Sequence, residues 1–261
     1  MIHKVSSGKC LVSILFILTF FLDAMPCRAD TSPLFQKTFL QYTLNDKKTG
    51  EQKGEVRIQI TQKGKTQEWL EVRKFNEDET DTFLVIFDPQ TLLPVNYTRE
   101  TEGLNGSRIL ELTLDGRELT ATITDIKGKT STQSLRLPEG SFVIEPFMKY
   151  YLTRLVDTPS RKGNFISIGL LNDKIKAFPI KWEIVGNATI ETPAGKFDCL
   201  DIVVSSPSWY LKLINKGTHV LLDASGDHQI IRTPARKSLL SEELVMVLIR
   251  VEKTPPDNAS E

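Results

Sequence analysis

Residues Trp182 to Val204 read WEIVGNATIETPAGKFDCLDIVV, and the rest of the chain is interpreted from this stretch outward. The segment from Thr189 to Glu191 has the spacing of a short strand, and apolar residues resume at Phe197. Between them, Pro193-Ala194-Gly195 provides a turn, because proline presets φ and glycine tolerates positive φ. The stretch therefore predicts a strand, a tight turn and a second strand.

Short runs of apolar residues, most of them alternating, continue this pattern along the chain. Turn-forming residues separate the runs at intervals of about ten residues, as an antiparallel meander requires. Asn105-Gly106 and Asp115-Gly116 are the strongest single hairpin signals. The expected strands are Phe39–Leu44, Val56–Ile60, Trp69–Val72, Phe83–Phe87, Val95–Arg99, Ile109–Leu114, Leu119–Thr124, Ser134–Leu137, Asn164–Ile168, Ile175–Ile184, Tyr210–Ile214, His219–Asp223, Gln229–Arg232 and Leu244–Glu252.

The period changes between Glu145 and Val156, where a short helix is expected. Large apolar side chains there recur at helical spacing and form one face. They are Phe147, Met148, Tyr151, Leu152 and Leu155. The fold class we expect is all-β and mainly antiparallel: a single domain, residues 30–253, built as a curved sheet or a β-barrel-like structure with one short helix against its inner face.

The first 29 residues have the pattern of a secretory signal peptide. A basic start precedes the apolar run Leu11–Leu22, and Cys27-Arg28-Ala29 supplies a small-x-small cleavage site. The alternative, a retained membrane anchor, requires about 20 apolar residues, and this run is shorter. We expect cleavage after Ala29, export to the periplasm or beyond, and no transmembrane span in the mature chain.

The mature chain would keep a single cysteine, Cys199, so no internal disulfide is expected. Its neighbours in sequence are mostly apolar, which predicts a small buried residue rather than a reactive thiol. At the other end, residues 254–261 are polar and rich in proline, and a disordered tail is expected there.

Charge argues against nucleic acid as a partner. The chain has 33 basic and 33 acidic residues, and a nucleic-acid binder shows a basic face. The basic and acidic residues are interleaved, which is typical of solvated strand faces.

No catalytic motif is found, so an enzyme is not expected and no cofactor is predicted. A two-carboxylate hydrolase assembled from distant strands stays open, since such a site leaves no local motif. His219, Asp223, Asp227 and His228 gather in one predicted hairpin, but their spacing matches no metal-ligand pattern, and no metal site is predicted.

The turn Thr192-Pro193-Ala194-Gly195-Lys196-Phe197 resembles the signature of the exported bacterial family of domains of unknown function numbered 3108 (DUF3108). The aromatic segment from Phe147 to Leu155, the strand Gly163–Ile168 and the strand pair around Asp223 are similar to that family as well. The resemblance implies an exported β-rich fold and no established reaction.

Three functions follow as hypotheses. The first is non-enzymatic binding of an apolar or lipid-like envelope molecule inside the curved sheet. Its candidate lining residues are Phe147, Met148, Tyr151, Leu155 and Trp182. The second is an envelope scaffold or protein-interaction module with a filled core, and the third is the motif-poor hydrolase.

Overall fold

A computed structural model describes residues 37–75, 78–89, 94–137, 142–144, 148–156, 159–171, 174–206, 217–225, 228–235 and 243–254. They belong to one compact unit, Ser32–Glu261. The predicted signal peptide, the strand expected at Tyr210–Ile214 and the tail after Thr254 lie outside the described residues.

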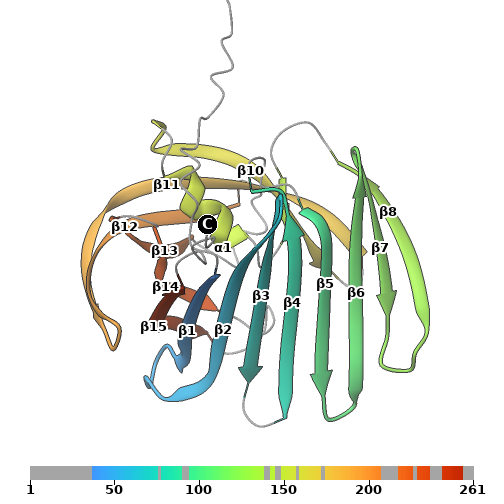
Figure 1. The fold of residues 1–261 in the computed structure, drawn as a ribbon, viewed down its shortest axis with the longest axis horizontal. Helices are drawn as coiled ribbons and strands as arrows, with labels where there is room; N and C mark the ends of the chain where they lie inside the picture. The colour runs from blue at the N-terminus through green and yellow to red at the C-terminus, as the bar shows by residue number, and fades with distance from the viewer. Residues whose placement is uncertain are drawn as a thin grey trace, which may run out of the picture. The chain divides into compact units, whose positions relative to one another are not determined.

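Fifteen strands of the described chain form one sheet, in the order β8-β7-β6-β5-β4-β3-β2-β1-β15-β14-β13-β12-β11-β10-β9 (Figure 1). All neighbours pair antiparallel except β9 and β10, which are parallel. The predicted all-β, mainly antiparallel fold class is confirmed. The strands are β1 Lys37–Asp46, β2 Gln52–Lys63, β3 Thr66–Phe75, β4 Glu79–Phe87, β5 Pro94–Gly103, β6 Gly106–Asp115, β7 Glu118–Thr124, β8 Thr130–Arg136, β9 Phe142–Ile144, β10 Lys162–Leu171, β11 Lys174–Thr192, β12 Gly195–Ser205, β13 Thr218–Asp223, β14 Ile230–Ala235 and β15 Leu244–Thr254.

The sheet is strongly curved but not closed, since its order ends at β8 on one side and β9 on the other (Figure 1). A side chain links the β8 end to β11: the Ile175 N–H donates to Gln133 Oε1 at 3.2 Å. The concave face of this open sheet is called the inner face below.

The hairpin predicted from Trp182–Val204 is present as β11 and β12. Thr192 pairs with Gly195 across a two-residue turn, and the Ala194 N–H donates to Thr192 Oγ1 at 3.2 Å. Gly195 has φ 133°, a conformation that side-chain-bearing residues rarely adopt. The turn chemistry therefore fixes the register of the two strands.

The hairpins predicted from Asn105-Gly106 and Asp115-Gly116 also form. Gly103 pairs with Gly106, and Asp115 pairs with Glu118. Beyond these turns, β11 runs as one strand of 19 residues, where the sequence indicated two shorter pieces. The alternation of apolar residues breaks near a register shift between Ile184 and Gly186, and this shift lets β11 continue as one strand.

The predicted helix is observed as α1, Met148–Leu155, and it lies against the inner face (Figure 1). The Tyr150 ring packs on Trp69 and Phe87, with centroid distances of 5.1 and 5.4 Å. Its hydroxyl donates to Gln67 Oε1 at 3.2 Å. Leu152 is fully buried. The helix therefore fills the inner face beside the ends of β3 and β4 that carry Gln67 and Phe87.

The buried apolar side chains form one core cluster drawn from both halves of the sheet. Its largest fully buried members include Trp69, Phe87, Ile168 and Ile202. Among the described residues, no helix has both the length and the apolar character needed to cross a membrane.

Candidate functional site

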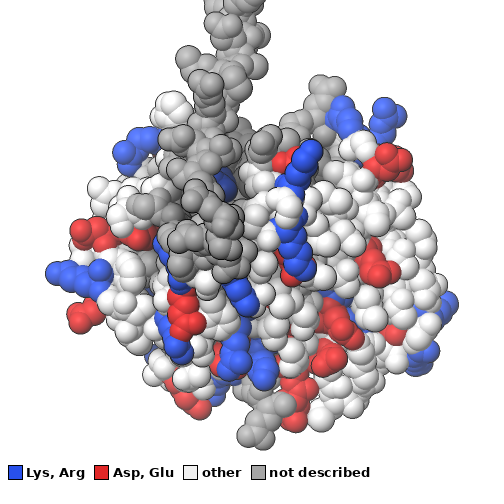
Figure 2. Space-filling model, in the orientation of Figure 1, with Lys and Arg blue, Asp and Glu red and all other residues white. Residues whose placement is uncertain are grey.

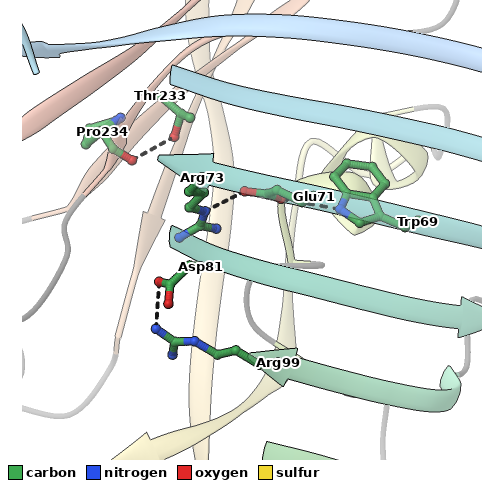
Figure 3. A network of polar contacts seen from close by, with 7 residues as sticks. All are labelled: Trp69, Glu71, Arg73, Asp81, Arg99, Thr233 and Pro234. Atoms are coloured by element: carbon green, nitrogen blue, oxygen red, sulfur yellow. Dashed lines mark hydrogen bonds and ion pairs between the residues drawn. The ribbon is translucent and has the colours of Figure 1, made fainter. Parts of the chain in front are cut away.

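Strands β3 to β5 carry charged side chains on their inner face. On β3, the residues that alternate inward are Trp69, Glu71, Arg73 and Phe75, so two charges lie between two aromatic rings. The register of the sheet places a third charged residue beside these two, because Arg73 pairs with Asp81 on β4. Directly paired side chains point to the same face of a sheet. We call Glu71, Arg73, Asp81 and Arg99 the inner charge cluster (Figure 3).

Glu71 is fully buried and accepts two hydrogen bonds from its own strand. Arg73 Nε donates to Oε1 at 2.6 Å, and Trp69 Nε1 donates to Oε2 at 3.3 Å. Figure 3 shows Glu71 lying along β3 between these two partners. A buried carboxylate is tolerated only when it is paired and hydrogen-bonded, and both conditions are met here.

Asp81 is the second buried carboxylate. Arg99 Nη2 donates to its Oδ2 at 2.9 Å, and Thr101 Oγ1 donates to its Oδ1 at 2.5 Å. Both donors come from β5, so this pair joins β4 to β5. The side chains of Arg73 and Arg99 are 12% and 33% exposed, which makes Arg99 the more solvated of the two guanidiniums.

The ring of Phe83 connects the two ion pairs. It lies opposite Glu71 on one side and Arg99 on the other. The guanidinium carbons of Arg73 and Arg99 are 4.5 and 5.0 Å from its centroid, within cation–π range. The cluster is therefore balanced in charge, with two carboxylates, two guanidiniums and an aromatic ring between them.

Tyr42 on β1 extends the polar inner surface. Its side chain is fully buried, and its hydroxyl has no hydrogen-bond partner within the described part of the chain. Burial raises the pKa of Tyr42 far above its ordinary value, and the negative charge of Glu71 raises it further. The hydroxyl therefore stays protonated.

A hollow of about 420 Å³ lies next to the cluster, where strands β3 to β6 end in their turns. Thr101 lines the hollow and also bonds Asp81, so it connects the two. Phe75 pairs with Glu79, and Thr101 pairs with Arg108, which places these side chains on the inner face. The described residues that line it are Phe75, Asp78, Glu79, Thr101, Glu102, Gly103, Leu104, Asn105, Gly106, Arg108 and Ile126.

Two apolar side chains at the hollow are largely in solvent. Leu104, in the β5–β6 turn, is 84% exposed, and Ile126, in the β7–β8 turn, is 53% exposed. Phe75 continues the apolar surface inward to the core. The hollow thus has an apolar wall beside carboxylates and a guanidinium, an arrangement suited to a molecule with one apolar and one polar part.

Three of the candidate lining residues from the sequence have described side chains, and these three lie away from the hollow. Tyr151 packs edge-on against Phe165 at a centroid distance of 5.4 Å, and Leu155 is half-buried against the core. Trp182 is buried in the core. Phe147 lies outside the described residues, and of Met148 only the backbone is described. Of the three whose side chains are described, none lines the hollow, and the role of all five in ligand binding stays a prediction.

The sequence analysis missed the inner charge cluster, because interleaved charges are expected on solvated strand faces. That expectation is wrong for Glu71 and Asp81, which are buried. A signal was present: Glu71 and Arg73 share the alternation of Trp69 and Phe75, and they fall on that same face. On the face of the molecule drawn in Figure 2 the expectation is met, since basic and acidic residues are interspersed there.

The histidines of the predicted hairpin lie apart from this site. His219 Nδ1 is 2.9 Å from Asp201 Oδ1, and His228 Nδ1 is 2.9 Å from the Asp223 carbonyl oxygen. In the part of the chain that the structure describes, no group of three or more His, Cys, Asp or Glu side chains is placed to hold a metal ion. Cys199 is buried, as predicted.

The profile of the family described as protein of unknown function, DUF3108, matches residues 41–233. Among solved structures, the chain is similar to a β-barrel-like protein of the domain of unknown function DUF1849 from Brucella abortus. That match has 8% identity, a TM-score of 0.55 and coverage of 84% of this chain and 98% of the other. At this identity the likeness concerns the fold alone.

Two further solved structures match with lower TM-scores. A candidate lipoprotein from Parabacteroides distasonis has 14% identity, a TM-score of 0.27 and coverage of 84% and 97% of the two chains. A candidate exported protein with a YmcC-like fold from Bacteroides fragilis has 12% identity, a TM-score of 0.26 and coverage of 84% and 96%. No curated protein matches the chain.

Proposed function

The chain belongs to the DUF3108 family of proteins of unknown function, and from its inner face we propose that it is a non-enzymatic binder of an amphipathic envelope molecule. The observation that carries this proposal is the hollow of about 420 Å³ on the inner face. Pockets for small ligands have volumes of roughly 300–1,000 Å³ and combine an apolar wall with a few placed polar groups.

The apolar part of the ligand lies against Phe75, Leu104 and Ile126. Of these three side chains Leu104 has the largest exposed fraction, 84%, so a ligand that covers it removes the most apolar surface from water. Covering it contributes about 1.5 kcal/mol, so an aspartate at this position weakens binding by at least about tenfold. The polar part of the ligand lies over Glu79, Thr101 and Arg108.

The inner charge cluster supports binding rather than proton transfer. Each buried carboxylate accepts a hydrogen bond from a guanidinium, and Asp81 also accepts one from the Thr101 hydroxyl. The Asp81 contacts join β4 to β5 beside the hollow, and the Phe83 ring, with Arg73 on one side and Arg99 on the other, connects β3 to them, which holds the wall of the hollow in place.

Two measurements test the proposal. Native mass spectrometry of the protein, purified without detergent from a bacterium expressing the full-length chain, should show an added mass that denaturation removes. Titration calorimetry with dodecyl maltoside below its critical micelle concentration should show saturable binding. The head group of this probe is uncharged, so its binding does not depend on a charge on the ligand.

The chain offers matched controls. Ile126 is 53% exposed at the hollow, and Val95 and Val185 are 54% and 52% exposed elsewhere. Leu104→Asp and Ile126→Asp should weaken maltoside binding, whereas Val95→Asp and Val185→Asp should not. Equal effects of all four variants, or no binding by the unchanged protein, would refute the proposal.

The second candidate function, a protein-interaction module, is favoured by one observation. The sheet ends at β8, and an end strand can accept a strand from another chain. Absence of both copurified mass and maltoside binding, together with crosslinking of a protein through β8, would favour this function instead.

A further inference from the structure

The hydrogen-bonding pattern of the β7–β8 ladder follows from two backbone bonds just beyond its ends. The Asp125 N–H donates to the Lys129 carbonyl oxygen at 3.0 Å, and the Leu137 N–H donates to the Arg117 carbonyl oxygen at 2.8 Å. In an antiparallel ladder only every second residue pair exchanges backbone bonds. Counted inward from either end, the residues of β8 that bond to β7 are Ser131, Gln133 and Leu135.

The remaining residues of β8 turn their backbone N–H and C=O groups away from β7. They are Thr130, Thr132, Ser134 and Arg136. Among the described strands none lies beyond β8 in the sheet (Figure 1). The link from Ile175 to β8 uses the side chain of Gln133 and no backbone group of β8. The outer edge of β8 is therefore a row of backbone donors and acceptors that faces solvent.

The usual protections of an end strand are missing from β8. Such strands are commonly kept from pairing with another chain by proline, lysine, a bulge or very short length. Residues 130–136 read TSTQSLR, and they pair with β7 without a register shift. At the other end of the sheet, β9 has only three residues. The two ends are thus built differently, and β8 is the one that can receive a strand.

We propose that β8 pairs antiparallel with β8 of a second copy of this chain, about a twofold axis at Gln133. In this register Thr130 lies opposite the partner's Arg136, and Thr132 lies opposite the partner's Ser134. All four residues with outward backbone groups then fall in hydrogen-bonded pairs. The contact is the same on both copies, as twofold symmetry requires.

The side chains of β8 fit a second copy in this register. Threonine and serine directly opposite each other are a favourable cross-strand pair, and like charges opposite each other are not. The one charged residue of β8, Arg136, meets a threonine of the partner and is paired within its own chain with Glu118 of β7. A shift of two residues would leave Arg136 without a bonded partner, so one register is preferred.

The dimer should be weak and should depend on protein concentration, because one strand pair buries less surface than a stable interface needs. Sedimentation velocity without lipid or detergent should show the unchanged protein moving from monomer to dimer as its concentration rises. Thr132→Pro removes one outward N–H from each copy and should weaken the dimer by about tenfold or more. Thr132→Ala keeps that N–H and is the control, with an effect below about threefold.

Cysteine variants test the register itself. Gln133→Cys places the two new thiols opposite each other, where the Cα atoms of a non-bonded pair lie about 4.5 Å apart, within disulfide range. Ser131→Cys is the control on the same strand and face: its two thiols would be four residues apart along the strand, about 13 Å. Cys199 is buried, so the introduced thiol is the accessible one.

With diamide as the oxidant, Gln133→Cys should form a linked dimer at least about tenfold faster than Ser131→Cys. Circular dichroism checks that each variant folds, and the proline variant decides the matter if Gln133→Cys does not. A protein that stays monomeric at every concentration, a dimer that Thr132→Pro leaves intact, or equal linking of the two cysteine variants would overturn the inference. Linking of Gln133→Cys to a different protein and never to itself would also overturn it. The binding of dodecyl maltoside is a separate measurement, so this inference and the proposed function can fail independently.

Discussion

Replacing Glu71 with glutamine removes one charge from the inner face while keeping the volume of the side chain. In the structure both carboxylate oxygens are used, by Arg73 Nε at 2.6 Å and Trp69 Nε1 at 3.3 Å. A glutamine offers one acceptor oxygen and one NH₂ group, so one of the two donors loses its acceptor. The Arg73 guanidinium also loses the counter-charge that Glu71 supplies.

The magnitude follows from burial. Removing one partner of a buried ion pair costs about 3–5 kcal/mol. Because Arg73 keeps some contact with solvent, the lower end applies, about 3 kcal/mol. For a chain of this size each kcal/mol changes Tm by about 2–4 °C, so Glu71→Gln should lower Tm by about 6–12 °C.

The exposed pair of Lys47 and Glu243 provides the control. The distance from Lys47 Nζ to Glu243 Oε2 is 2.8 Å, close to the 2.6 Å between Arg73 Nε and Glu71 Oε1, but both residues of the control pair are exposed. Such pairs contribute at most about 1 kcal/mol, so Glu243→Gln should lower Tm by less than about 4 °C. Thermal and urea unfolding followed by circular dichroism measure both variants.

The double variant Glu71→Leu/Arg73→Met distinguishes a lost charge partner from lost packing. It removes both charges, so much of the stability lost in Glu71→Gln should return. A loss below about 1 kcal/mol for Glu71→Gln, or a double variant less stable than the single one, would show that the pair does not act as a buried ion pair.

Two further predictions concern the C-terminal half of the sheet. Gly163→Ala should lower the free energy of unfolding by about 1–3 kcal/mol, measured in urea, because the added Cβ would lie 2.7 Å from Trp182 Nε1. Gly169→Ala is the control: its added Cβ would have its closest contact at 3.9 Å, so the loss should be less than about 1 kcal/mol. Equal losses for the two variants would contradict this prediction. Burial, assisted by nearby carboxylates, raises the pKa of Cys199 to about 11, so at pH 8 a disulfide reagent should label this thiol only after unfolding. Its stabilising contribution is present below about pH 8.5, the ordinary thiol pKa, and is lost as pH rises towards 11; rapid labelling of the native protein at pH 8 would contradict the buried placement.

The elements that the sequence predicts well are those with local causes. The hairpins at Asn105-Gly106 and Asp115-Gly116 form because their turn residues select the backbone conformation within four positions. The helix α1 forms where the apolar spacing changes period. β9 was not predicted, since a strand of three residues is too short to show alternation, and it forms by parallel pairing with β10.

The candidate site could not be predicted in the same way, because its residues come together only through register. Asp81 meets Arg99 and Thr101 across the β4–β5 ladder, about twenty positions away in sequence. The hollow likewise combines the β3–β4, β5–β6 and β7–β8 turns, and no segment alone indicates it. The alternation of Trp69, Glu71, Arg73 and Phe75 was the one local signal.

The first and last strands of the described chain are neighbours: β1 pairs with β15 from Lys37–Thr254 through Asp46–Leu244. During synthesis β1, Lys37–Asp46, is made long before its partner β15, Leu244–Thr254. One edge of β1 therefore stays open until β15 has been made. Such distant pairing slows folding, and an open edge can capture strands of other chains. Cleavage before Leu244 would return the finished protein to this vulnerable state, so proteolysis near the C-terminus should lead to aggregation rather than to a shortened, soluble product.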